Sequence, residues 1–138
     1  MLAAEVTWNG TLMRVTRVSP DYELIRRGAV EVGIALRIGS FGGAFSESDK
    51  TALSLAALAG ELVRAAEAKG LIVRELQVDF DCATARLDGY RLWVLAIRHA
   101  TGSVPVTITA LPTWLNGAAF RALAETAGRY ILQVHSLA

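Results

Sequence analysis

The sequence has little of several features that would point to a particular class of protein. Its single cysteine, Cys82, excludes an internal disulfide but leaves the redox compartment open. Lysine and arginine (14 residues) nearly balance aspartate and glutamate (13 residues), and the basic residues are scattered along the chain. Because no basic patch forms an electrostatic footprint, we expect no nucleic-acid partner.

Long apolar runs are also missing, because Ser, Glu, Arg and Lys interrupt every helix-like segment. We therefore expect no membrane span. The N-terminus, MLAAEVTWNG, lacks the basic and apolar regions of a secretory signal. The cytoplasm is the default expectation for localisation, which stays undecided if the N-terminus is incomplete.

Hydrophobic residues, by contrast, make up 53% of the 138 residues and charged residues 20%, which is typical of one folded domain with a well-buried core. Asn9-Gly10 lies between two stretches rich in β-branched residues, so a hairpin with a type I′ turn is predicted near residues 5–17. A short helix at residues 21–27 then stops at Gly28. Residues 1–28 thus form an N-terminal hairpin and helix, ahead of an α/β body over residues 29–138.

Strands and helices alternate along that body. The predicted strands cover residues 30–38, 72–80, 104–111 and 129–135, and the predicted helices cover residues 48–69, 87–100 and 117–127. A capping signal at Ser46–Asp49 opens the first helix, Asn116 caps the last, and Gly70, Gly102 and Gly128 follow the helix ends. The order hairpin, then β-α-β-α-β-α-β, needs crossover connections and so predicts an α/β fold with a parallel sheet.

The strands have unequal faces. In the second parallel strand Leu76, Val78 and Phe80 share one side, and Gln77, Asp79 and Asp81 share the other. A doubly wound sheet is covered on both faces and should be apolar on both. A (β/α) barrel explains the asymmetry better, because polar residues at the C-terminal strand ends would then line the mouth of the barrel.

The length of the chain conflicts with a complete barrel, which needs roughly 250 residues. Four parallel strands and a hairpin make about half of one. We therefore expect a partial TIM-type barrel, with three explanations open. The chain is a fragment or truncated product, it completes its barrel by pairing with a second copy as a homodimer, or it is a small open α/β sheet.

Three segments carry a family likeness: LQVDFDCATARLDGYRLWVLAIR, VPVTITALPTWL and YILQVH. They resemble a bacterial family of unknown function, domain-of-unknown-function family 3142, whose members are similar to glycoside-hydrolase barrels. The resemblance covers about residues 30–136 and implies a (β/α) barrel with a carbohydrate-linked role, without an established reaction. The Asp79-x-Asp81 strand also resembles that of family 18 chitinase-type barrels. Ala83 stands where that family has its proton-donating glutamate, so the chitinase mechanism does not carry over.

Asp79 and Asp81 are the candidate catalytic residues. Their Cα atoms are ~6.6 Å apart at ~3.3 Å rise per residue, within the roughly 5–9.5 Å that glycoside hydrolases use between carboxylates. Two neighbours on one strand rarely lie on opposite sides of a substrate. One aspartate would therefore be catalytic, and the other would orient it or raise its pKa through like-charge repulsion. The alternative is structural, with Asp79 paired to Arg37 and Asp81 capping the turn near Thr84.

The candidate substrate-binding residues are Arg37, Gln77, Thr109, Trp114, Gln133 and His135. Trp114 could stack on a sugar or fold into the core, and Gln77 and Gln133 could bind sugar hydroxyls or satisfy an interior network. His135 could serve as an acid or base or could be a solvated chain end. Arg37 could bind an acidic sugar, although pairing with Asp79 is favoured.

Cofactor and metal signals are weak. The loop with Gly39, Gly42 and Gly43 could cradle a phosphate but lacks the Lys-Ser/Thr ending of a P-loop. Nothing fixes the geometry of two aspartates and a histidine around a cation, and Cys82 has no histidine placed to activate it. We expect no cofactor and no metal.

The sequence thus predicts a glycoside-hydrolase-like barrel protein that hydrolyses or remodels a polysaccharide through strand-end carboxylates. Two alternatives stay open: a non-catalytic carbohydrate-binding or scaffold protein, and a fragment without independent activity.

Overall fold

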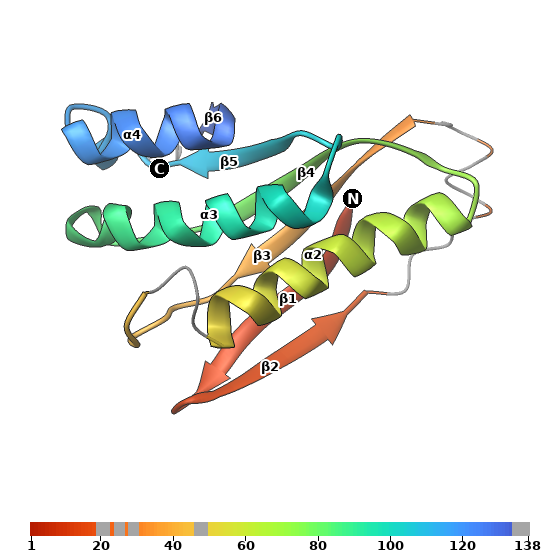
Figure 1. Cartoon of the computed structure of the whole chain (residues 1–138), viewed down its shortest axis with the longest axis horizontal. Helices are drawn as coiled ribbons and strands as arrows, with labels where there is room; N and C mark the ends of the chain where they lie inside the picture. The colour runs from red at the N-terminus through yellow and green to blue at the C-terminus, as the bar shows by residue number, and fades with distance from the viewer. Residues whose placement is uncertain (19–22, 24–26, 28–30, 46–49, 134–138) are drawn as a thin grey trace, which may run out of the picture.

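The computed structural model describes residues 1–18, 23, 27, 31–45 and 50–133 (Figure 1). The strands are β1 (Leu2–Asn9), β2 (Leu12–Arg17), β3 (Glu31–Ile38), β4 (Ile72–Phe80), β5 (Val106–Ala110) and β6 (Gly128–Leu132). The helices are α2 (Lys50–Ala68), α3 (Leu87–Thr101) and α4 (Ala118–Ala127), with 3₁₀ turns η1 (Thr84–Arg86) and η2 (Pro112–Trp114). Most of the helix predicted at 21–27 lies outside the described residues, as do the capping signal at 46–49 and His135.

The N-terminal hairpin is present, but its turn differs from the prediction. Asn9 pairs with Leu12, so Gly10 and Thr11 form the two-residue loop and Asn9 belongs to β1. Gly10 has φ 65°. In the described part of the chain only glycines have positive φ, so Thr11 does not. Positive φ at the first central position alone is typical of a type II′ turn, not the type I′ turn expected from Asn9-Gly10.

The predicted alternation of strands and helices is confirmed. The six strands form one sheet in the order β2-β1-β3-β4-β5-β6, in which every neighbouring pair is parallel except β1 and β2. Strand β1 pairs with β3, which joins the hairpin to the main sheet. This mixed α/β architecture is consistent with a partial (β/α) fold preceded by a hairpin.

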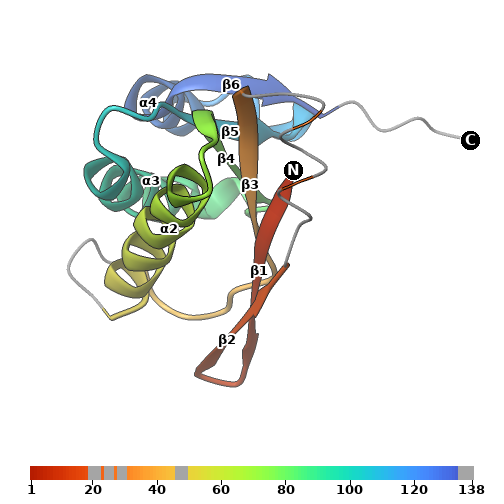
Figure 2. The same cartoon turned by 90° about the vertical axis from the view of Figure 1, so that its right-hand side faces the viewer.

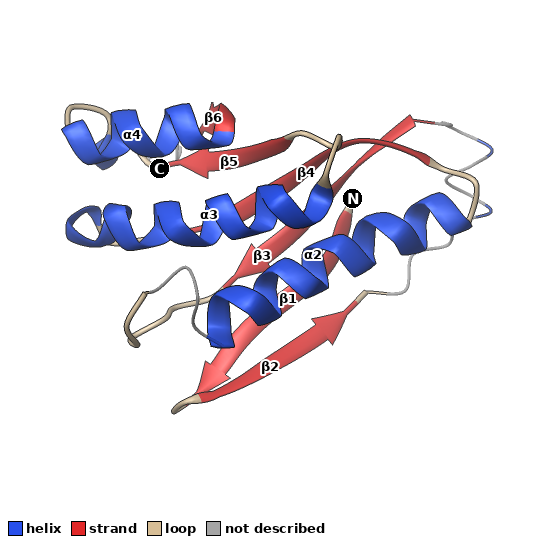
Figure 3. Ribbon diagram, in the orientation of Figure 1, coloured by secondary structure: helices blue, strands red, loops and turns tan. Residues whose placement is uncertain are grey.

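The helices cover only one face of the sheet. Strands β3, β4, β5 and β6 have the same order in the sheet as in the sequence. Right-handed crossovers between such neighbouring strands place every connecting helix on the same face of the sheet. Figure 2 shows α2, α3 and α4 together on one side, and Figure 3 shows the helices and strands in alternation. A doubly wound arrangement is therefore excluded for the described residues.

The two faces differ in burial as the alternation predicted. Leu36, Leu76 and Val78 point toward the helices and are completely buried. On the opposite face Gln77 and Asp79 are only half-buried. Strand β5 departs from the pattern, because Thr107 and Thr109 on that face are buried as well.

Glycines follow the helix ends, as the sequence predicted. Gly128, directly after α4, has φ 88°, a left-handed conformation that glycine adopts without strain. The start of α4 differs from the prediction: Gly117 is its N-cap, not Asn116, and no side chain caps the helix there.

Candidate functional site

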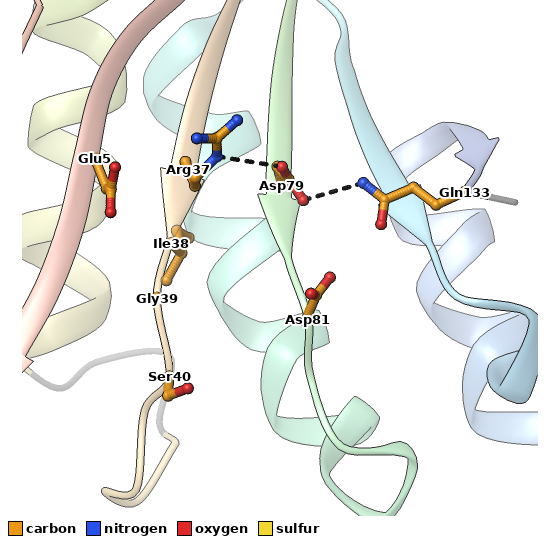
Figure 4. Close-up of a pocket in the computed structure, with 8 residues that line it drawn as sticks. All are labelled: Glu5, Arg37, Ile38, Gly39, Ser40, Asp79, Asp81 and Gln133. Atoms are coloured by element: carbon orange, nitrogen blue, oxygen red, sulfur yellow. Dashed lines mark hydrogen bonds and ion pairs between the residues drawn. The ribbon is translucent and has the colours of Figure 1, made fainter. Parts of the chain in front are cut away.

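A hollow of about 380 Å³ lies at the C-terminal ends of β3 and β4 and beside the middle of β1, on the face without helices (Figure 4). Its lining residues are Glu5, Arg37, Ile38, Gly39, Ser40, Asp79, Asp81 and Gln133. Four of the eight predicted site residues are thus brought together in one place: Arg37, Asp79, Asp81 and Gln133. Figure 4 shows their side chains projecting from the side of the strands opposite the helices.

Strand register explains why these residues meet. Glu5 is level with Arg37 on the neighbouring strand, and Arg37 is level with Asp79 on the next. Neighbouring strands lie ~4.8 Å apart and residues at the same level face the same way, so the three side chains form one row. Gln133 joins the row from beyond β6, where its backbone N–H donates to the Ala110 carbonyl oxygen at 2.8 Å.

Asp79 is the most highly connected side chain of this hollow. Its Oδ2 lies 3.6 Å from Arg37 Nε in an ion pair, and its side chain is 25% exposed. Its Oδ1 accepts a hydrogen bond from Thr109 Oγ1 at 3.0 Å and another from Gln133 Nε2 at 3.3 Å. Contacts from β3, β5 and the end of β6 therefore fix the orientation of this carboxylate, and the predicted pairing with Arg37 is part of that arrangement.

Asp81 lies one step further along the chain and is exposed (Figure 4). No hydrogen bond or ion pair joins its side chain to any other residue that the structure describes, so the structural role predicted for it near Thr84 is not formed. The hollow therefore combines one carboxylate held by three partners with a second whose side chain is exposed.

The remaining predicted residues lie around or outside this hollow. Gln77 is half-buried on the same face but does not line the hollow, because it sits one row toward the N-terminal strand ends. Thr109 is buried on the neighbouring strand β5, level with Asp79, and its hydroxyl donates a hydrogen bond to the Asp79 carboxylate. His135 lies outside the described residues.

Trp114 does not fit the sugar-stacking role predicted for it. Its side chain is completely buried, and its Nε1–H donates to the Cys82 carbonyl oxygen at 2.9 Å. The ring packs between Tyr90 and Phe120, with centroids 6.2 Å away in each case. The 3₁₀ turn η2 directs the indole inward, so it stabilises the core and ties the segment after β4 to the segment after β5.

Two further groups near the carboxylates are poor nucleophiles. Burial raises the pKa of the Cys82 thiol to about 11, a shift that nearby Arg86 partly opposes. Burial also raises the pKa of the Tyr90 hydroxyl well above 10, and Cys82, Asp79 and Asp81 add to that shift. Both groups are therefore protonated at neutral pH, which agrees with a structural role for Cys82.

Glu5 and Ser40 line the hollow but were not among the predicted residues. Glu5 belongs to the hairpin, and only the pairing of β1 with β3 brings it beside Arg37. The only sequence signal for Glu5 was its position on the polar side of an alternating strand. That signal does not predict which strand lies beside β1.

Neither a metal centre nor a membrane helix is found in the described part of the chain. Its His, Cys, Asp and Glu side chains form no group of three or more that could hold an ion. None of its helices is long and apolar enough to cross a membrane.

Comparison with known protein families gives a match over most of the chain. Residues 35–138 match the family model described as "Domain of unknown function (DUF3142)". The matched segment includes Arg37, Asp79, Asp81 and Gln133, while Glu5 precedes it. No curated protein and no solved structure matches the chain.

Proposed function

The chain belongs to the DUF3142 family, and from this membership and the hollow at the strand ends we propose that it is part of a glycoside-hydrolase-like (β/α)-barrel protein acting on a polysaccharide. One observation carries the proposal. Asp79 is oriented by Arg37, Thr109 and Gln133, while Asp81 beside it is exposed and has no hydrogen-bond or ion-pair partner among the described residues.

The chemistry of the lining suits sugar hydroxyls, which both donate and accept hydrogen bonds. Asp79, Asp81 and Glu5 supply acceptors, and Arg37 supplies donors. Gln133 contributes an amide that does both. Polar groups that converge from separate strands on a hollow of about 380 Å³ are typical of a site that orients a small polar ligand unit.

Hydrolysis of a glycosidic bond needs two carboxyl groups on opposite sides of the bond. Asp79 and Asp81 share a strand, but Glu5 lies two strands from Asp79, a Cα separation of ~9.6 Å at ~4.8 Å per strand. We assign Glu5 and Asp81 to opposite walls of the hollow, one protonating the leaving oxygen and the other activating water. Asp81 lies two residues beyond Asp79, so the Cα atoms of Glu5 and Asp81 are ~12 Å apart. Carboxyl groups that reach toward each other across this span leave room for the water of an inverting mechanism, which needs ~6.5–9.5 Å between them.

A second copy of the chain would complete the barrel. In the described residues the sheet ends at β2 and β6, and β6 exposes Tyr130 (48%), Ile131 (47%) and Leu132 (38%). An edge strand with exposed apolar side chains favours pairing with another strand. Light scattering should therefore give the mass of a dimer, and a well-folded monomer at micromolar concentration would contradict dimerisation.

A non-catalytic carbohydrate-binding protein is the second candidate. It is favoured by Ala83, which stands where chitinase-type barrels have their catalytic glutamate. The two candidates differ in turnover, because a Glu5→Gln enzyme loses turnover and keeps binding, whereas a binding protein has no turnover to lose.

The test uses hexasaccharides with cello-, xylo-, laminari- and chito-type linkages, with affinity measured by calorimetry and hydrolysis by release of reducing ends. Asp81→Asn should abolish turnover and weaken binding of the hexasaccharide that binds the wild type. Glu125→Gln, which changes an exposed carboxylate on α4, is the matched control and should leave both unchanged. Absence of binding to every member of the panel would contradict the proposal.

A further inference from the structure

A second hollow, of about 370 Å³, lies between the hairpin turn and the segment that follows β3. Its lining residues are Trp8, Gly10, Thr11, Phe41, Gly42, Gly43, Ala44 and Thr51. We propose that it is a further sugar-binding subsite in which Trp8 is the stacking surface. This inference rests on the proposed function, because it assigns a second unit of the same polysaccharide to this hollow.

Trp8 has the exposure that a stacking residue needs. It is the partly exposed tryptophan of the chain, whereas Trp93 and Trp114 are completely buried. Trp93 packs behind the Trp8 ring, with centroids 5.9 Å apart and planes 26° apart, and Phe41 contacts it at 4.7 Å. A partly exposed indole that neighbouring rings hold in place can pack its accessible surface against the C–H face of a pyranose ring at little entropic cost.

The other walls of the hollow leave room for such a ring. A Cβ atom built on Gly10 or Gly42 would have no other atom of the described residues within 4 Å, so these residues leave the space above both glycines open. The side chains of Thr11 and Thr51 add hydroxyl groups to the lining. An aromatic surface with small residues and hydroxyls around it suits a sugar, which has an apolar face and a polar rim.

The two hollows are joined by one continuous segment. Ile38, Gly39 and Ser40 line the first hollow, and residues 41–44 line the second. Trp8 shares the strand parity of buried Val6 and packs on Trp93 of α3, so the second hollow lies on the helix-covered side and this segment crosses the C-terminal edge of the sheet between the two hollows. A polymer bound at Asp81 reaches Trp8 by passing over that edge. Such continuity favours a polysaccharide over an unrelated small ligand.

Arg86 fixes the shape of the connecting segment. Its Nη1 donates to the Phe41 carbonyl oxygen at 2.6 Å, and its Nη2 donates to the Gly43 carbonyl oxygen. The guanidinium also lies 4.4 Å from the centroid of the Phe45 ring. Because Arg86 ends the 3₁₀ turn that follows β4, it links this segment to the strand that carries both aspartates.

Tryptophan fluorescence tests the inference on the intact chain. Acrylamide should quench mainly Trp8, and the quenchable emission should disappear in Trp8→Phe. The hexasaccharide that binds the wild type should reduce the quenching, while the disaccharide of the same linkage, held in the first hollow alone, should not.

Substitution of Gly42 offers a steric test that leaves Trp8 and its contacts with Trp93 and Phe41 unchanged. Its φ is not positive and no described residue occupies the space above it, so Gly42→Leu should fold normally and fill the hollow, with Gly42→Ala as the matched control. We expect Gly42→Leu to weaken hexasaccharide binding about tenfold and to leave disaccharide binding unchanged.

The outcomes separate the two proposals. Hexasaccharide binding that is weakened by Asp81→Asn but unaffected by Gly42→Leu, with Trp8 still quenched, would overturn the second subsite alone. No binding of any saccharide to the wild type would overturn the proposed function and the subsite with it. Protection of Trp8 together with a chain-length-dependent effect of Gly42→Leu would support both.

Discussion

Replacing Trp114 with phenylalanine should destabilise the protein strongly, because the indole is a core residue that also donates a hydrogen bond. Its Nε1–H bonds the Cys82 carbonyl oxygen at 2.9 Å, and the side chain is completely buried. Leaving that carbonyl oxygen without its donor costs ~1–3 kcal/mol. The smaller ring leaves a cavity that costs about 1–2 kcal/mol more.

The sum is a loss of about 3 kcal/mol in the free energy of unfolding, which lowers Tm by ~10 °C at roughly 3–5 °C per kcal/mol. The assay is urea unfolding followed by far-ultraviolet circular dichroism, with the m-value expected to stay constant. Trp8→Phe, at a partly exposed position, is the control and should cost less than ~1 kcal/mol. A Trp114→Phe protein of wild-type stability with weakened sugar binding would refute the reasoning and restore the stacking role predicted from the sequence.

Three other predictions concern Tyr90, Cys82 and Arg86, which lie near the segment that follows β4. Tyr90→Phe should leave stability unchanged or raise it by about 1 kcal/mol, since the buried hydroxyl has no partner among the described residues; a clear loss in urea unfolding would reveal an unseen partner. The Cys82 thiol, with its pKa raised from 9.0 to about 11, stabilises the fold below pH 9, and that stability is lost as the pH rises toward 11. Cys82→Ala should therefore flatten the decline in unfolding free energy over this window by up to ~2 kcal/mol, and an unchanged slope would exclude the effect. Arg86→Ala should speed proteolytic cleavage within residues 41–45, detected by mass spectrometry, because the carbonyl oxygens of Phe41 and Gly43 lose their donor; wild-type cleavage rates would contradict that role.

Local pattern was sufficient to predict most of the fold. The period-2 alternation from Leu76 to Asp81 gave both the strand and its two faces, and the glycines after each helix marked the helix ends. The polar ends of β3 and β4 follow from the same alternation. Arg37 and Asp79 therefore meet in the hollow as expected, once the strands are placed side by side.

Features that depend on distant neighbours were not predictable in this way. Glu5 joins the site only because β1 lies beside β3, a pairing between residues far apart in sequence. Trp114 follows a proline and reads locally as a loop residue, yet the 3₁₀ turn directs its ring into the core. At the hairpin, a shift of one residue in pairing changed the turn type expected from Asn9-Gly10.

The most direct measurement of the central claim is a titration of ¹⁵N-labelled protein with the panel of hexasaccharides, followed by amide chemical shifts. The account predicts that the largest shifts fall on Arg37, Gly39, Asp79, Asp81 and Gln133, and that Asp81→Asn weakens them while Glu125→Gln does not. Shifts confined to the helix-covered side of the sheet, or none for any member of the panel, would contradict a carbohydrate site at the strand ends.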